Sequence, residues 1–182
     1  MIEVTVEINL KGLKKFNLQM NTDLQGSTNG PIRKAINQWG YRFRAEMQQR
    51  FAKFSKGGGK WPPLSQRTLK ARRKGKGSGT PAILRDKGLL FTALSPAFAN
   101  IPGQLNKTIP FGVEVGYGGP AAHGSGGKAT IADIASFHQV GAGYLPIRTV
   151  IESPSRSTIS DMAADMQRAL KKLSDGTIEG QA

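Results

Sequence analysis

Apolar and polar residues alternate at the beginning of the chain. Four β-branched residues are separated from one another by single polar ones: Ile2, Val4, Val6 and Ile8. A period of two built on such side chains is typical of a strand with one buried face. We therefore predict a strand over residues 2–9, and the looser apolar pattern that follows predicts a short amphipathic helix over residues 10–24.

The longest periodic pattern follows Pro31, a residue suited to the first turn of a helix because its missing N–H needs no partner there. Apolar side chains recur every three or four residues over about six turns. They are Ile32, Ile36, Trp39, Phe43, Met47, Phe51 and Phe54. This spacing predicts a long helix that ends at Gly57–Gly59, with the aromatic stripe packed in a core. Its other face is expected to be polar and solvated, with Arg33, Lys34, Arg42, Arg44, Gln48 and Gln49.

The remaining elements are shorter. Ser65 is a good N-cap for a helix that ends at Arg73, and Asp86 is expected to cap another over residues 87–94. Apolar alternation predicts a strand at residues 112–116 and a β-prone segment at 145–151. Helical spacing predicts a helix over 131–139 that ends near Gly141, and a C-terminal helix over 157–173.

This order of elements predicts an α+β fold. A short antiparallel sheet would pack against the long amphipathic helix and the C-terminal helix, with long glycine-rich loops between them. We expect one domain over residues 1–173, with a basic arm at 57–80 and a flexible loop at 117–130. Residues 174–182 are expected to form a flexible tail.

Composition narrows the class of protein. The chain of 182 residues has no cysteine, so it forms no disulfide and no thiolate zinc site. No apolar run approaches the roughly 20 residues needed to span a bilayer, and the N-terminus does not resemble a signal peptide. We therefore expect that the protein is made in a cytoplasm and does not associate with a membrane.

The positive charge is confined to one part of the chain. Between Arg33 and Lys87 there are sixteen Lys and Arg against two acids, so this segment holds the whole net charge of +14. Such segregation suggests a polyanionic partner, or a surface kept solvated until assembly. The densest run supplies candidates for facing DNA or lining a channel: Arg67, Lys70, Arg72, Arg73, Lys74 and Lys76. Three interpretations stay open for this run: a solvated face, a contact with another protein or subunit, or non-specific contact with duplex DNA phosphates.

Trp61 stands between a glycine run and two prolines, outside any periodic segment. Large aromatics on loops often act as interface hot spots, so Trp61 with Pro62 and Leu64 is a candidate contact with a neighbouring subunit. Packing within its own subunit and stacking on a base are the alternatives. If the contact lies between subunits, the arm is mobile in the monomer, is ordered only on assembly, and tolerates Trp61→Ala without loss of monomer stability.

None of the common catalytic or metal-binding motifs is complete in this sequence. Gly59-Lys60 and Gly75-Lys76 lack the Ser or Thr that a phosphate-binding loop needs next, and Ser125 lacks the first glycine of a nucleophile elbow. His123 and His138 stand near no carboxylate cluster that would complete a metal site. Asp161 and Asp165 fall on a polar helix face, where solvated charges are the simpler interpretation. We therefore expect no enzymatic activity, no cofactor and no metal.

Two blocks of the chain carry a further pattern. The first includes Lys60-Trp61-Pro62-Pro63-Leu64-Ser65, Thr68-Leu69-Lys70-Ala71-Arg72-Arg73 and Ile83-Leu84-Arg85-Asp86-Lys87-Gly88. The second includes Phe137-His138-Gln139-Val140-Gly141 and Leu145-Pro146-Ile147-Arg148. In order and spacing the blocks resemble the virion-morphogenesis, or tail-completion, proteins of Mu-like tailed phages, over residues 30–173. The chain departs from the family pattern at Lys87, where threonine is usual, and at Thr149-Val150, where Pro-Phe is frequent.

The resemblance implies a structural protein of the virion. Such a protein acts in tail completion, as a tail terminator, or in the neck as a head–tail connector. It would form a hexameric ring around the DNA channel, contact other neck, tail-tube or connector proteins, and assemble in the host cytoplasm. The resemblance gives a structural role to His138, Gln139, Gly141, Pro146 and Arg148. The charge alone supports a second hypothesis, a non-specific nucleic-acid-binding accessory protein that uses residues 33–87.

Overall fold

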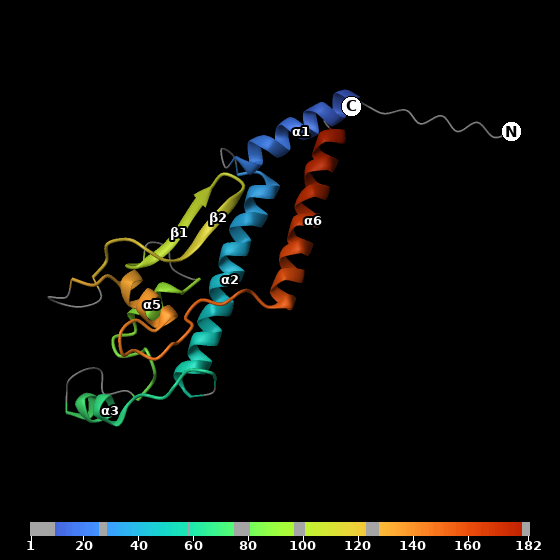
Figure 1. The fold of residues 1–182 in the computed structure, drawn as a ribbon. Coiled ribbons are helices and arrows are strands. Elements are labelled where there is room, and N and C mark those ends of the chain that lie inside the picture. Colours follow the sequence, from blue (N-terminus) through green and yellow to red (C-terminus); the bar gives the residue numbers. More distant parts are fainter. Residues whose placement is uncertain are drawn as a thin grey trace. The chain divides into compact units, whose positions relative to one another are not determined.

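The computed structural model describes residues 10–25, 29–57, 59–74, 81–96, 101–122 and 128–179. In this part of the chain lie six helices and one two-stranded antiparallel sheet, which confirms the α+β class with a short sheet and a C-terminal helix (Figure 1). The helices are α1 (Leu10–Leu24), α2 (Pro31–Ser55), α3 (Gln66–Arg73), α4 (Leu89–Ala93), α5 (Ile131–Val140) and α6 (Arg156–Glu179). The strands are β1 (Gln104–Ile109) and β2 (Gly112–Tyr117). The strand predicted over residues 2–9 lies outside the described residues.

The chain divides into two compact units, where the sequence suggested one domain. Unit 1 contains Met1–Trp39, Thr108–Val113 and Ile159–Ala182, and unit 2 contains Gly40–Lys107 and Glu114–Thr158. Helix α2 and the β1–β2 hairpin therefore each contribute residues to both units.

Unit 1 is built on a helical core. Ile32, Ala35 and Ile36 of α2 pack against Ala169 and Leu173 of α6, which lies alongside this part of α2 (Figure 1). Helix α1 covers the same cluster with its apolar face, formed by Phe16, Met20 and Leu24. The first turn of α2 is capped from α1, since the Ile32 N–H donates to the buried Asp23 carboxylate at 2.8 Å.

Arg33 departs from the sequence expectation of a solvated helix face. Its side chain is buried, and its guanidinium donates to four backbone carbonyls, those of Asp23, Leu24, Ile109 and Gly112. The first two carbonyls end α1, where a positive charge also complements the helix dipole. The other two flank the hairpin turn, so a single side chain joins α1, α2 and the hairpin turn within unit 1.

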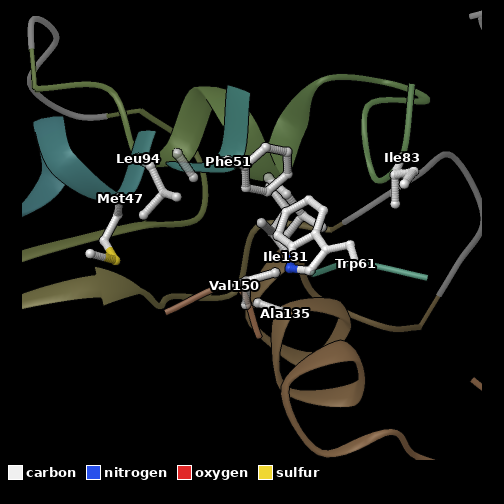
Figure 2. Close-up of a cluster of buried hydrophobic side chains, with 10 residues drawn as sticks. Met47, Phe51, Trp61, Ile83, Leu94, Ile131, Ala135 and Val150 are labelled. Carbon is white, nitrogen blue, oxygen red and sulfur yellow. The ribbon is translucent and has the colours of Figure 1, made fainter. Parts of the chain in front are cut away.

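Unit 2 is built around the second part of α2. Met47 and Phe51 of α2 meet Leu90 and Leu94 from the α4 region, Ile131 and Ala135 of α5, and Val150; Figure 2 shows most of these side chains converging. The apolar stripe predicted for α2 is thus confirmed as core. The N-terminus of α5 is fixed by a capping box in which the Thr130 hydroxyl and the Asp133 carboxylate each accept the other residue's N–H.

Several predicted boundaries were wrong for identifiable reasons. Helix α4 begins after Gly88, whose left-handed φ of 73° replaces the expected Asp86 cap. Strand β1 was missed because its mostly polar sequence lacks apolar alternation. Helix α6 continues to Glu179, so residues 174–179 are helical where a tail was predicted. The loop predicted at 117–130 does lie between the end of β2 and the start of α5, and residues 123–127 of it lie outside the described residues. Its ends are held by the Tyr117 hydroxyl on the Leu90 carbonyl and by a bridge between Ala122 and Thr130.

Candidate functional site

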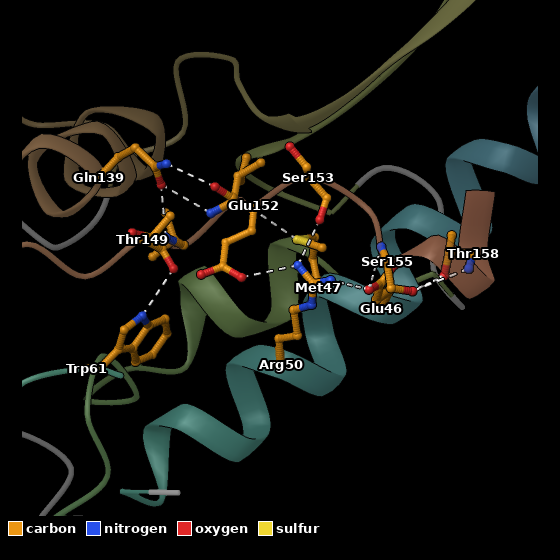
Figure 3. Close-up of polar contacts among 12 residues, drawn as sticks. Glu46, Met47, Arg50, Trp61, Gln139, Thr149, Glu152, Ser153, Ser155 and Thr158 are labelled. Atoms are coloured by element: carbon orange, nitrogen blue, oxygen red, sulfur yellow. Dashed lines mark hydrogen bonds and ion pairs between the residues drawn. The ribbon is translucent and has the colours of Figure 1, made fainter. Parts of the chain in front are cut away.

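Trp61 lies in the core of unit 2. The side chain is 6% exposed, and its ring meets Phe51 and Phe54 edge-on, with ring centroids 4.8 and 5.6 Å away. Its indole Nε1 donates to the Thr149 carbonyl at 3.0 Å (Figure 3). The expectation that Trp61 is an exposed anchor on a mobile arm is therefore wrong, and packing within its own subunit is what the structure shows.

The glycine run explains this difference. A Cβ on Gly59 would lie 1.9 Å from the Phe54 ring, so only glycine allows the chain to pass this close to α2. Gly57 adopts a φ of 85°, which reverses the chain at the end of the helix. Gly57 and Gly59 thus allow the chain to turn so that Trp61 packs back onto α2. Leu64 is half-buried and packs on the same core, and Pro62 is half-buried as well.

Arg148 joins the two blocks that carry the phage resemblance. Its Nε and Nη2 donate to the Pro62 carbonyl at 3.2 Å each, and Nη2 also donates to the Pro63 carbonyl at 3.3 Å. The guanidinium is buried, and burial together with the nearby charge of Arg72 lowers the pKa of Arg148. The Arg148 N–H donates to the His138 carbonyl at 2.8 Å, which ties this segment to the end of α5.

Gln139 binds the same segment from the other side. Its Oε1 accepts from the N–H groups of Val150 and Ile151 at 2.9 and 3.1 Å, and its Nε2 donates to the Ile151 carbonyl at 2.9 Å (Figure 3). Residues 145–151 form no strand, contrary to the β-prone expectation, and Gln139 supplies hydrogen-bond partners to the backbone at Val150 and Ile151 instead. We call Trp61, Gln139 and Arg148 with the backbone they bind the interlock.

The other motif residues surround the interlock. His138 is buried in α5. Gly141 ends α5 with a φ of 74°, and a Cβ there would lie 2.6 Å from Ile147. Pro146 is exposed. Of the three, Gly141 shapes the turn between α5 and Arg148 through its left-handed φ and its close approach to Ile147.

The fold buries one residue of the basic run and leaves its other described candidates exposed. Arg72 is buried, donates to the Ala82 carbonyl at 2.9 Å and lies 3.7 Å from Asp86, so its assignment as a DNA-facing residue was wrong. The other described candidates of the run are exposed: Arg67, Lys70, Arg73 and Lys74. Lys76 lies outside the described residues. Arg67, Lys70 and Lys74 are spaced by three and four positions, so they share one face of α3, which we call the basic face.

Arg44 is a further cation removed from the surface. Its side chain is 1% exposed, and within the described part of the chain its Nε and Nη1 have no hydrogen-bond acceptor. The guanidinium carbon lies 5.1 Å from the centre of the Tyr41 ring, and burial lowers the pKa of Arg44. Arg33, Arg44, Arg72 and Arg148 thus contribute little to the exposed charge.

A carboxylate that the sequence analysis did not single out connects α2 with the start of α6. Glu46 accepts from the Ser155 N–H at 3.0 and 3.1 Å and pairs with Arg50, which also reaches Glu152 at 3.2 Å (Figure 3). Burial alone raises the pKa of Glu46, but hydrogen bonds from Thr158 and Ser155 and the charge of Arg50 outweigh it and lower that pKa overall. Only the i,i+4 pair with Arg50 could be predicted from the sequence, since Glu152, Ser155 and Thr158 lie more than 100 positions along the chain.

We expect this carboxylate to make stability depend on acid pH. A group whose pKa is lower in the folded state stabilises the fold above its unfolded pKa, about 4.3 for Glu, and this stabilisation disappears as the pH falls through the folded value. Glu46→Gln should therefore lose less stability than the wild type between about pH 6 and pH 3, as measured by urea unfolding. Glu114→Gln, at an exposed position of β2, is the matched control. Equal pH profiles for wild type and Glu46→Gln would contradict this role.

An exposed apolar surface adjoins the interlock. Five large hydrophobic side chains reach solvent within eleven positions: Phe137, Val140, Tyr144, Leu145 and Ile147. No Lys, Arg, Asp or Glu occurs from Ile134 to Ile147. The turn is nevertheless ordered, because the N–H groups of Gly141 and Ala142 donate to the Phe137 carbonyl and that of Leu145 to the Ala142 carbonyl. We call these five residues the apolar surface; the missing charge was the signal in the sequence that could have revealed it.

The remaining comparisons are negative. Within the described residues, no group of three or more His, Cys, Asp or Glu side chains is placed to hold a metal ion. Among the described helices, none combines the length and hydrophobicity that crossing a bilayer requires. No protein-family model, no curated protein and no solved structure matches this chain.

Proposed function

We propose that this chain is a structural protein of a tailed-phage virion, acting in tail completion or the neck as a ring-forming subunit around the DNA channel. The observation that carries the proposal is the interlock. Two segments about 85 positions apart, both named by the resemblance or next to its blocks, are joined by side chains. Arg148 donates to the carbonyls of Pro62 and Pro63, and Trp61 donates to the carbonyl of Thr149, which directly follows Arg148.

The chemistry of these residues supports a structural role. The indole N–H of Trp61 donates to a backbone carbonyl, and so do Nε and Nη2 of Arg148. The Gln139 amide is likewise used on backbone groups through both its oxygen and its nitrogen. Motif residues used in this way hold a scaffold in shape rather than act on a substrate. The scaffold presents two surfaces for assembly, the basic face of α3 and the apolar surface.

The mass of the protein in solution tests the ring. Light scattering on the full chain should give a closed oligomer of several copies without DNA. A monomer at all concentrations, which associates only after duplex DNA is added, would overturn the proposal. That result would favour the nucleic-acid-binding accessory protein, the alternative that the basic face also supports.

DNA binding should be electrostatic and without sequence preference. Replacing Arg67, Lys70 and Lys74 together by Gln should reduce the slope of log affinity against log salt by about 2 to 3, since each phosphate contact contributes about 0.9. A control that replaces the exposed Lys14, Lys15 and Lys171 by Gln lowers the net charge equally and should change the slope less. Equal slopes for the two variants, or a strong preference for one DNA sequence, would contradict contact through α3.

A further inference from the structure

We infer that neighbouring copies assemble head to tail, with the apolar surface of one copy seated in a groove of unit 1 on the next. This inference rests on the proposed function, because it names the two surfaces through which the ring-forming subunits would meet. The protruding surface is centred on Tyr144, whose side chain is fully exposed. The receiving groove lies between α1, the start of α2 and α6.

The groove has the chemistry that an apolar surface needs. It has a volume of about 340 Å³ and is lined by Leu18 and Thr22 of α1, Pro31 of α2 and Leu173 of α6. Leu18 is itself mostly exposed, so an apolar rim stands open to solvent. The one charged residue in the lining, Asp23, is buried and already accepts the Ile32 N–H.

The distribution of positive charge favours a second copy of this chain as the occupant of the groove. It also favours this groove over the hollows that are lined by Lys and Arg. The chain carries a net charge of +14, so two copies repel each other wherever cations face cations. A hollow between α2 and α6 is lined by Lys34, Arg168 and Lys172, and one beside α3 by Lys56 and Arg85. Neither the Leu18 groove nor the apolar surface contains a Lys or Arg, so the two fit each other without charge repulsion. An acidic partner would instead be attracted to the basic face.

The two surfaces differ, which determines the symmetry of the assembly. Each copy would use its apolar surface on one neighbour and its groove on the other. Such a heterologous contact builds a ring when the rotation closes, whereas a surface that pairs with itself stops at a dimer. The apolar surface is held rigid by Gln139 and Arg148, so little ordering would be needed on docking.

Cross-linking between two single-cysteine variants tests this contact. The natural chain has no cysteine, so Ser136→Cys, at an exposed position one turn before Val140, and Gln19→Cys, at an exposed position in the lining of the groove, each carry one thiol and keep Tyr144 and Leu18 in place. Mixing isotopically labelled Ser136→Cys with unlabelled Gln19→Cys and adding a short bismaleimide should give mainly dimers of mixed mass. Because each protein has a single thiol, any such link is between molecules. Mixing Ser136→Cys with Lys53→Cys, at an exposed position of α2 that does not line the groove, should give few mixed dimers.

Substitution of Tyr144, the centre of the apolar surface, gives an independent measurement. Tyr144→Ser should weaken self-association about 30-fold, the loss typical of an interface hot spot, while Tyr144→Phe keeps it. Both variants should keep the wild-type melting temperature, since Tyr144 is exposed. Unchanged self-association in Tyr144→Ser would overturn the inference.

The outcomes separate this inference from the proposed function. If the wild type is oligomeric but the cysteine variants link Ser136→Cys mainly to Ser136→Cys, or form no link between Ser136→Cys and Gln19→Cys, the head-to-tail contact is overturned and the ring is left standing. A wild type that is monomeric at every concentration overturns both.

Discussion

Trp61→Ala should lower the free energy of unfolding by about 3–5 kcal/mol, the usual cost of removing a large buried aromatic. The variant loses the contacts with Phe51 and Phe54 and leaves the Thr149 carbonyl without its indole donor. Urea unfolding followed by circular dichroism measures this loss. The expected result reverses what the sequence suggested, a mobile arm whose tryptophan could be removed without cost to the monomer.

A matched variant separates packing from hydrogen bonding. Trp61→Phe keeps an aromatic ring beside α2 and loses the bond to Thr149, so we expect a smaller loss, about 1–2 kcal/mol. A loss below about 1 kcal/mol in Trp61→Ala would be typical of a surface substitution, and would show that residues 60–73 are not part of the core. Hydrogen exchange provides a second measurement, because this segment should be protected in the isolated protein.

Arg33→Met should be comparably damaging in unit 1, with a loss of about 3 kcal/mol or more. Methionine fills a similar volume but donates no hydrogen bond, so the carbonyls of Asp23, Leu24, Ile109 and Gly112 lose their shared donor. Each buried polar group left unpaired costs about 1–3 kcal/mol unless water replaces the donor. Chemical denaturation measures the effect.

The neighbouring residue provides the control for Arg33. Lys34→Met removes the same charge from an exposed position of the same helix and should change stability by less than about 0.5 kcal/mol. Arg33→Lys keeps the charge but not the planar fork, so it should fall between the two. Equal stabilities of Arg33→Met and Lys34→Met would contradict the role of Arg33 in joining α1, α2 and the hairpin.

Helices were predictable because their signals are local. The apolar period after Pro31, the Ser65 cap and the stop at Gly141 each act within a few residues, and all three predictions are confirmed. Strand β1 was not predictable in this way, because a strand depends on its partner and the mostly polar sequence of β1 carries no clear alternation.

The candidate site was predictable in part. The resemblance singled out Trp61, Gln139 and Arg148, but nothing in the sequence shows which backbone groups they bind. Trp61 donates to the Thr149 carbonyl and Arg148 to the Pro62 and Pro63 carbonyls, across about 85 positions. Trp61 was wrongly predicted to pack on a neighbouring subunit, because a glycine run considered without its tertiary neighbours is typical of a hinge. It becomes a tight turn only when the Phe54 ring lies against Gly59.

The amino-acid sequence by itself determined the helices of this protein and confined its net charge to residues 33–87, because helix periods, caps and charge depend on residues near one another. The tertiary structure decided which of those charges are exposed. Arg33, Arg44 and Arg72 belong to the basic segment yet are buried, while Arg67, Lys70 and Lys74 remain at the surface. The acceptors that bury Arg33 include carbonyls 76 and 79 positions away, and such a partner exists only once the chain has folded.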